Sequence, residues 1–169
     1  MLLYHGTICN EKIILQILKS GKLTPSKNTG IINESPNEEP MNHVYMNAIS
    51  RKEIYKMKHR CGITFNINVL LNKTFYTRKH HGGNYANNCK TNDRNIIYHI
   101  LYRLYRSSLK VINENNMEIP SLCLFQEVFT KSDISLKYAK YIYLPKNISQ
   151  KVLKIINEKY PNMEIIFIK

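Results

Sequence analysis

Two groups of polar residues in this sequence could act together on one small polar ligand. Near the amino terminus, His5, Gly6 and Thr7 offer an imidazole, an unobstructed backbone and a hydroxyl where a first strand is expected to end. Near the carboxyl terminus, Glu127 shares a face of a predicted strand with aromatic residues such as Phe129. A carboxylate among apolar neighbours needs a partner, which makes Glu127 a candidate for chemistry. The alternative is an edge strand on which Glu127 faces water.

The elements that would position these groups follow from capping residues and hydrophobic periodicity. Asn10 is a candidate N-cap for a helix whose apolar positions run to Leu18, and Gly21 fits the position just past its end. Asp93 is the candidate N-cap of the longest helix. Predicted strands span 2–4, 43–46, 61–67, 122–129, 141–144 and 163–168, with a further helix through 152–156 and long irregular segments at 24–42 and 72–92. There is no internal repeat and no linker, so we expect a single domain over residues 1–169.

Composition limits the classes of partner and of setting. Lys and Arg number 25 against 12 Asp and Glu, and the resulting net charge of +13 favours a polyanion such as nucleic acid. The abundance of Asn, Ile, Lys and Tyr is typical of AT-rich coding, which weakens that argument. No apolar stretch is long enough to cross a bilayer, so we expect no membrane partner. The four cysteines form no Cys-x-x-Cys pair and no signal peptide is recognisable, which favours a reducing, cytoplasmic setting.

Read together, three segments resemble the motifs of the ADP-ribosyltransferase superfamily, in the branch with a His, Tyr, Glu triad. Residues 3–7 (LYHGT) resemble the first motif, residues 43–46 (HVYM) the second and residues 126–129 (QEVF) the third. The segment from Ser50 to Tyr55 resembles the helix start that follows the second motif. This branch includes the poly(ADP-ribose) polymerases and small DNA-targeting toxins of the DarT kind.

The resemblance implies a fold and a co-substrate. The fold would be α+β, with two mostly antiparallel sheets packed around an NAD cleft and helices on their flanks. NAD+ would be the co-substrate and no metal is expected. The activity would be mono-ADP-ribosyl transfer and not polymer formation, because nothing in the sequence resembles the regulatory apparatus of the polymerases. The protein is expected to be a monomer.

The same resemblance implies roles for individual residues. His5 would bind the adenosine ribose, Gly6 would contact the nicotinamide amide through its backbone, and Thr7 would support them. Tyr45 and Tyr55 would pack against the nicotinamide, and Ser50 would be a further NAD-binding residue. Glu127 would accept from the 2′-hydroxyl of the nicotinamide ribose and stabilise the oxocarbenium-like charge that develops as nicotinamide leaves. The catalytic set is therefore His5, Tyr45 and Glu127.

The acceptor is expected to be nucleic acid, with DNA favoured over protein. Two basic, aromatic regions are candidates for binding it: the segment that carries Arg78, Lys79 and His80, and the side of the long helix that carries Tyr102, Arg103 and Arg106. For the helix, a partly buried amphipathic surface with a solvated rim is an equal alternative. Arg51 and Arg78 are both candidates for the arginine that DarT-like toxins use near NAD, and a neutralising protein partner is conceivable for a toxin of this kind.

Other functions remain open from the sequence. The chain could be an inactive relative that binds nucleic acid through its basic surface. It could also cleave NAD+ without an acceptor, as a glycohydrolase does, or transfer a phosphate from RNA to NAD+ as RNA 2′-phosphotransferases do. Zinc is disfavoured, because the spacing of histidines and cysteines matches no zinc pattern.

Overall fold

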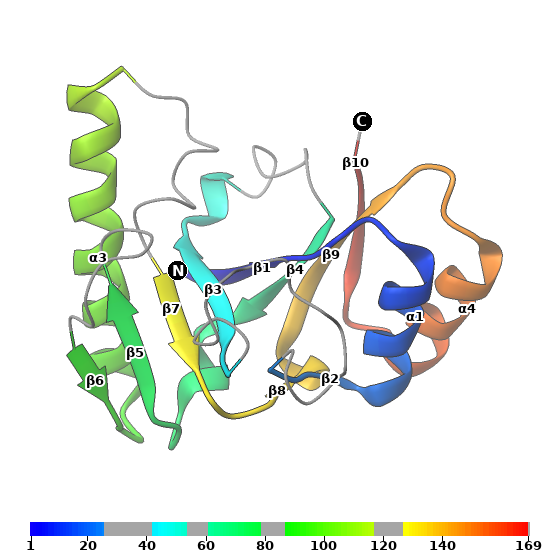
Figure 1. Cartoon of the computed structure of the whole chain (residues 1–169), viewed down its shortest axis with the longest axis horizontal. Helices are drawn as coiled ribbons and strands as arrows, with labels where there is room; N and C mark the ends of the chain where they lie inside the picture. Colours follow the sequence, from blue (N-terminus) through cyan, green and yellow to red (C-terminus); the bar gives the residue numbers. More distant parts are fainter. Residues whose placement is uncertain (26–41, 54–60, 79–86, 117–126, 169) are drawn as a thin grey trace.

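A computed structural model describes residues 1–25, 42–53, 61–78, 87–116 and 127–168 (Figure 1). Its helices are α1 (Glu11–Ser20), α3 (Arg94–Glu114) and α4 (Gln150–Lys159), and short 3-10 turns are η2 (Arg51–Glu53), η3 (Ile67–Leu70) and η5 (Leu136–Tyr138). Its strands are β1 (Leu2–Gly6), β2 (Lys22–Leu23), β3 (Val44–Ile49), β4 (Gly62–Asn66), β5 (Phe75–Arg78), β6 (Asn87–Cys89), β7 (Glu127–Thr130), β8 (Ile134–Ser135), β9 (Ala139–Pro145) and β10 (Glu164–Ile168).

The predicted helix boundaries are confirmed by their caps. The Asn10 side chain accepts from the backbone N–H groups of Lys12 and Ile13, and α1 ends at Gly21, whose φ of 72° is the left-handed conformation that glycine adopts without strain. The Asp93 side chain accepts from the N–H of Asn95 at the start of α3. Local hydrogen bonds therefore define where these helices begin, as the sequence predicts.

Eight strands form one continuous sheet in the order β10-β9-β4-β1-β3-β7-β5-β6, while β2 and β8 form a separate two-stranded sheet. The paired strands are antiparallel except β9 and β10, which are parallel. The predicted α+β class is confirmed. The layout differs from two comparable sheets, because β1 pairs with β3 on one side and β4 on the other and so joins the two halves.

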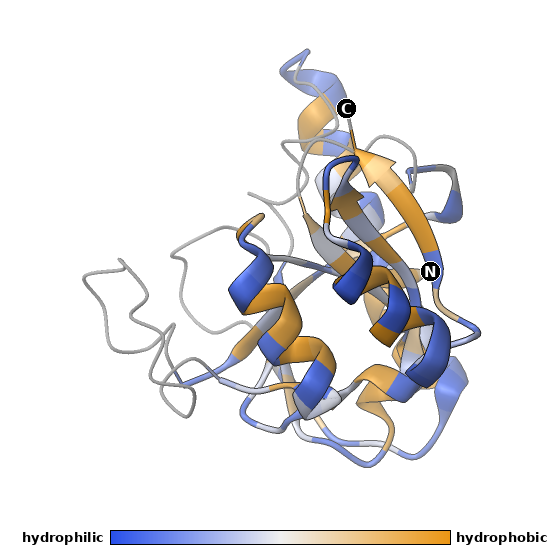
Figure 2. Ribbon diagram, turned by 90° about the vertical axis from the view of Figure 1, so that its right-hand side faces the viewer, coloured by the Kyte–Doolittle hydropathy of each residue, from blue (hydrophilic) through white to orange (hydrophobic). Residues whose placement is uncertain are grey.

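The two faces of the large sheet have different coverings. One face carries the main core, to which the strands contribute Leu3, Met46, Ile63, Val128 and Ile142 and the helices contribute Ile14, Leu18, Leu101, Leu104 and Val152. Figure 2 shows α1 and α4 toward the viewer, each with a hydrophobic side separated from a hydrophilic side. The opposite face carries a smaller cluster of Leu2, Tyr4, Ile49, Cys61, Tyr143 and Ile168. The three described helices thus cover one face of the large sheet and do not cover the other.

The prediction of an irregular segment between β4 and α3 is wrong. Residues 72–92 were expected to be irregular, yet β5 and β6 form an antiparallel pair within them, and β5 also pairs with β7. The alternation of Phe75 and Thr77 toward the core with Tyr76 and Arg78 on the other face is the strand signal. The predicted strand over 122–129 is confirmed from Glu127 onward, and its first five residues lie outside the described residues.

A disulfide bond joins Cys9, just after β1, to Cys61, just before β4, with the Cα atoms 5.2 Å apart. The sequence carries no signal for this pair, because 52 residues separate the two cysteines. The bond conflicts with the reducing setting expected from cysteine spacing, since disulfides persist mainly in oxidising environments. Cys89 is a free, partly buried thiol.

We predict that Gly62→Ala destabilises the protein at the end of β1. A Cβ atom at position 62 would lie 2.5 Å from Cε2 of Tyr4 and 2.6 Å from the backbone oxygen of His5, so both must shift. Overpacking of this kind costs roughly 1–3 kcal/mol, which urea unfolding measures. Gly6→Ala is the matched control, because its nearest atom would be 3.5 Å away. Equal stability of the two variants would contradict the prediction.

Candidate NAD site

A cluster of polar and aromatic side chains lies on the sheet face opposite the three described helices. Strand register brings it together: Phe129 on β7 pairs with Tyr45 on β3 and with Tyr76 on β5, and Glu127 pairs with Arg78. Residues two apart on a strand point to the same face, so all five side chains gather on one side. We call these five residues the β3-β7-β5 cluster.

The centre of this cluster is a buried ion pair. Nε of Arg78 donates to Oε2 of Glu127, and each side chain is only 8% exposed. The guanidinium carbon of Arg78 also lies over two rings, 5.5 Å from the centroid of Tyr45 and 5.0 Å from that of Phe129. Glu127 is therefore a buried, partnered carboxylate, and the alternative in which it faces water is wrong.

The rings of the cluster form a stack. Phe129 lies between Tyr45 and Tyr76, with centroids 5.1 Å and 5.4 Å away and ring planes within 24° of parallel. His43, two residues before Tyr45 on the same side of the chain, packs edge-on against Phe129 at 5.1 Å. Phe129 is fully buried, whereas Tyr45 and Tyr76 on either side of it are partly exposed and offer ring surface to a flat ligand.

His5 is attached to this cluster through the backbone. Its Nδ1–H donates to the carbonyl oxygen of Tyr45 over 2.7 Å. Burial lowers the pKa of His5, and the hydrogen bond to Tyr45 raises it by a smaller amount. The imidazole is therefore neutral near pH 7, with Nδ1 as donor and Nε2 as an acceptor. This is a suitable state for accepting from a ribose hydroxyl.

Gly6 and Thr7 continue the chain from His5 at the open end of β1. Gly6 is exposed and pairs with Gly62 of β4, and the Thr7 N–H donates to the carbonyl of Cys61 over 2.9 Å. Two residues after Thr7, Cys9 forms the disulfide bond with Cys61. The predicted first motif is thus fixed on both sides, by hydrogen bonds to β3 and β4 and by a covalent link.

Ser50 lies at the end of β3, and a buried carboxylate beside it was not predicted. The Ser50 N–H donates to Glu53 Oε2 over 2.7 Å, and the hydroxyl of Tyr105 on α3 donates to Glu53 Oε1 over 2.6 Å. Burial and the hydrogen bond to Glu53 raise the pKa of Tyr105 to about 12. The spacing of Ser50 and Glu53 is that of a capping box, which is the sequence signal for this contact. Tyr55 lies outside the described residues.

The predicted acceptor-binding residues separate into two places. Arg78 is buried on β5 against Glu127, so its expected place on an irregular basic segment is wrong. Lys79 and His80 lie outside the described residues. Tyr102, Arg103 and Arg106 are exposed on α3, whose buried residues pack into the core on the other face of β3. They do not join the β3-β7-β5 cluster.

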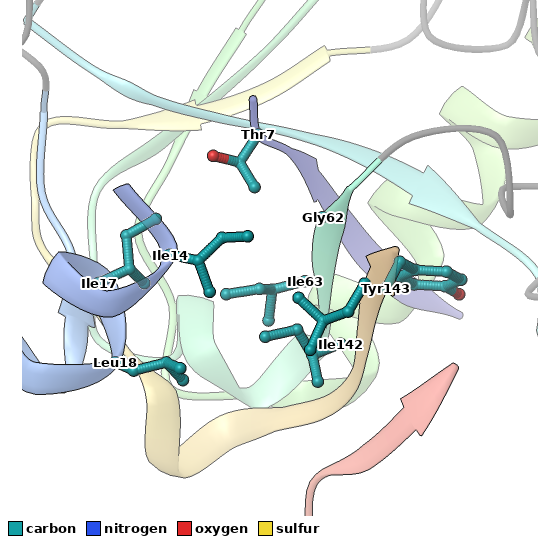
Figure 3. A pocket seen from close by; sticks show the side chains of 9 residues that line it. Thr7, Ile14, Ile17, Leu18, Gly62, Ile63, Ile142 and Tyr143 are labelled. Atoms are coloured by element: carbon teal, nitrogen blue, oxygen red, sulfur yellow. The ribbon is translucent and has the colours of Figure 1, made fainter. Parts of the chain in front are cut away.

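A small apolar pocket lies between α1 and the sheet, lined by Thr7, Ile14, Ile17, Leu18, Gly62, Ile63, Ile142, Tyr143 and Leu144 (Figure 3). Its volume of about 10 Å³ has room for one water molecule at most. This pocket is part of the packing beneath the first motif, and it is too small to hold a nucleotide.

Two further properties apply to the described residues. They contain no group of three or more His, Cys, Asp or Glu side chains that could hold a metal ion. None of the helices within them combines the length and the apolar character needed to cross a membrane.

No protein-family model matches this sequence, and no curated protein does. Solved structures do resemble it. Thermus sp. 2.9 DarT in complex with NAD+ has a TM-score of 0.59 at 15% identity, covering 99% of this chain and 94% of that chain. The same protein with carba-NAD+ scores 0.58 at 14% identity, covering 99% and 95%, and with ADP-ribosylated ssDNA it scores 0.54 at 13% identity, covering 99% and 93%. The expected resemblance is confirmed for the fold, almost from end to end.

We predict that removing one partner of the buried ion pair is more harmful than removing both. Arg78→Leu leaves Glu127 in an apolar stack without its guanidinium, a change that typically costs about 3–5 kcal/mol. Arg78→Leu with Glu127→Leu removes both charges and should recover much of that loss. Chemical unfolding of the two single variants and the double variant measures the coupling. If the loss of unfolding free energy in the double variant equals the sum of the losses in the two single variants, the two residues are not coupled and the prediction is wrong.

We predict that His5 makes the protein less stable as the pH falls. Because the pKa of His5 is lowered from 6.5 in the folded protein, the unfolded chain binds a proton more readily below that pH. The contribution of neutral His5 is therefore present above pH 6.5 and is lost as the pH falls toward the folded pKa. Urea unfolding at about pH 7.5 and pH 5.5 should show a smaller pH effect in His5→Asn than in the wild type. An equal effect would contradict it.

Proposed function

We propose that this chain is a DarT-like enzyme that transfers a single ADP-ribose from NAD+ to single-stranded DNA. The observation that carries the proposal is a chain of contacts that links the strands of the three motif residues. His5 donates to the backbone carbonyl of Tyr45, and the Tyr45 ring lies against Arg78, which pairs with Glu127. Support comes from the shared fold, since the DarT structures of that fold hold NAD+ and ADP-ribosylated ssDNA.

NAD+ would bind at the open end of β1. Neutral His5 accepts from a hydroxyl of the adenosine ribose, while the backbone of Gly6 contacts the nicotinamide amide next to Thr7. Gly6 suits this role because it is exposed and has no side chain to keep a ligand away. Tyr45 would offer its partly exposed ring to the nicotinamide, supported from behind by Phe129.

Glu127 would act on the bond that breaks. As the bond between nicotinamide and ribose C1′ lengthens, the electron pair leaves with nicotinamide and positive charge develops on the ribose. A carboxylate held in place beforehand stabilises that charge mainly in the transition state. The hydrogen bond from Arg78 to Oε2 fixes the orientation of Glu127, and the same pairing offsets the cost of burying the carboxylate. An acceptor atom of DNA then attacks C1′ and loses its proton.

Arg78 is thereby proposed as a positioning residue of the site, in place of its predicted role on an acceptor loop. Of the two candidate arginines, Arg78 contacts Glu127 directly, whereas Arg51 lies exposed on η2. A monomer, a cytoplasmic location and a neutralising protein partner also belong to the proposal. The location requires that the bond between Cys9 and Cys61 be absent or protected in reducing surroundings.

The proposal predicts label transfer that depends on Glu127. Incubation of the protein with NAD+ labelled on the adenylate phosphate should place label on single-stranded DNA, in preference to duplex DNA, RNA or protein. Glu127→Gln keeps the shape but removes the charge, and should lower transfer by about a hundredfold or more. Glu164→Gln, an exposed acid on β10, is the matched control and should transfer normally.

Other outcomes would distinguish the rival functions. Nicotinamide release without label on any acceptor would indicate a glycohydrolase. A phosphate passed from RNA to NAD+ would indicate a phosphotransferase. Nucleic-acid binding without any nicotinamide release would indicate a binding module, and transfer that survives in Glu127→Gln would show that the catalytic assignment is wrong.

A further inference from the structure

We propose that the exposed side of α3 is a second binding surface for the nucleic-acid strand, separate from the β3-β7-β5 cluster. Arg94, Tyr98, Tyr102, Arg106 and Lys110 are each four positions apart, so they form one stripe along the helix. At 1.5 Å per residue, the part from Arg94 to Arg106 is about 18 Å long. The stripe places two aromatic rings between cations, and we call it the α3 stripe.

The two rings are in a geometry suited to stacking. Tyr98 and Tyr102 have centroids 5.9 Å apart and ring planes within 8° of parallel. They are 40% and 39% exposed, although the helix has a large buried side on which Ile97, Leu101 and Leu104 pack into the core. Two parallel, exposed rings provide flat apolar surface on which unpaired bases can stack.

The charges around the rings favour a polyanion. The helix carries four cations, Arg94, Arg103, Arg106 and Lys110, and Glu114 is its one carboxylate. Glu114 lies beside Lys110, with 3.7 Å between Nζ and Oε1, at the far end from the rings. Arginines at both ends of the ring pair could therefore contact phosphates while the bases stack. Single-stranded nucleic acid fits both features, whereas a duplex hides the faces of its bases.

The position of the helix makes this surface distinct from the proposed site of chemistry. In Figure 1, α3 stands at one end of the molecule and α1 and α4 stand at the other. The helix packs against the core side of the sheet, while Tyr45 and Glu127 lie on the opposite face. The α3 stripe would therefore hold DNA beyond the nucleotide that is modified. This inference rests on the proposed function only for the identity of the strand as DNA.

The inference is tested by the binding of a fluorescent single-stranded DNA 20-mer to the full chain without NAD+. Fluorescence anisotropy measures the affinity. Tyr98→Ala with Tyr102→Ala should weaken binding by at least about tenfold, because each stacked ring contributes substantially. Tyr98→Phe with Tyr102→Phe keeps both rings and should bind within about threefold of the wild type. Circular dichroism of each variant confirms that α3 is still folded.

The salt dependence tests the arginines. Arg94→Gln with Arg106→Gln should lower the slope of log affinity against log salt by about 1.4, since each phosphate contact on a single strand contributes about 0.7. Lys151→Gln with Lys154→Gln, on the exposed side of α4, removes two cations elsewhere and should change the slope less.

The outcomes separate this inference from the proposed function. Wild-type affinity in the double alanine variant, or wild-type protein that binds no single strand, would overturn the α3 stripe. Binding that depends on the rings, together with wild-type protein that transfers no label from NAD+, would support the stripe and overturn the proposed chemistry. Glu164→Gln, which changes an exposed acid on β10, should bind the 20-mer normally.

Discussion

The buried ion pair between Arg78 and Glu127 is the interaction on which the arrangement of the site depends. A charged carboxylate or guanidinium alone in this aromatic surrounding would be expensive, so each side chain requires the other. The pair forms because the register of β5 and β7 sets Arg78 directly opposite Glu127. A slip of β5 by one residue would turn Arg78 toward the core and away from Glu127. The register of β5 and β7 therefore determines whether the ion pair of the site can form.

The same register explains how the sheet can be both a core and a site. Every second residue of β3, β5 and β7 points into the main core, where Met46, Phe75 and Val128 pack. The residues between them point to the other face and are free of that packing role. Because the three described helices cover only the core face, the second face can carry charge and rings without breaking the hydrophobic interior. The site uses positions outside the main core, although Phe129, Glu127 and Arg78 are themselves buried.

Local features of the fold were predictable from the sequence, and non-local ones were not. Asn10, Gly21 and Asp93 act within a few residues of themselves, so their capping roles follow from residue type alone. Arg78, the partner of Glu127, is 49 residues away in the sequence. It lies on β5, a short strand whose polar neighbours in the sequence predicted an irregular segment. The disulfide bond between Cys9 and Cys61 is equally non-local. The three motifs named His5, Tyr45 and Glu127 as candidates, but the contacts that link their strands required the structure.

Glu53 gives α3 a fixed relation to the strand that carries Tyr45. Its two carboxylate oxygens accept from Ser50 at the end of β3 and from the Tyr105 hydroxyl on α3. Glu53 is 3% exposed, and losing either hydrogen bond would leave a buried charge less satisfied, so sliding of α3 along the sheet is opposed. The pKa of about 12 for Tyr105 keeps this donor protonated at physiological pH. A single strand of DNA bound to the α3 stripe, as proposed, would therefore be held at a constant distance from Tyr45. A constant distance is what positioning one nucleotide for transfer would require.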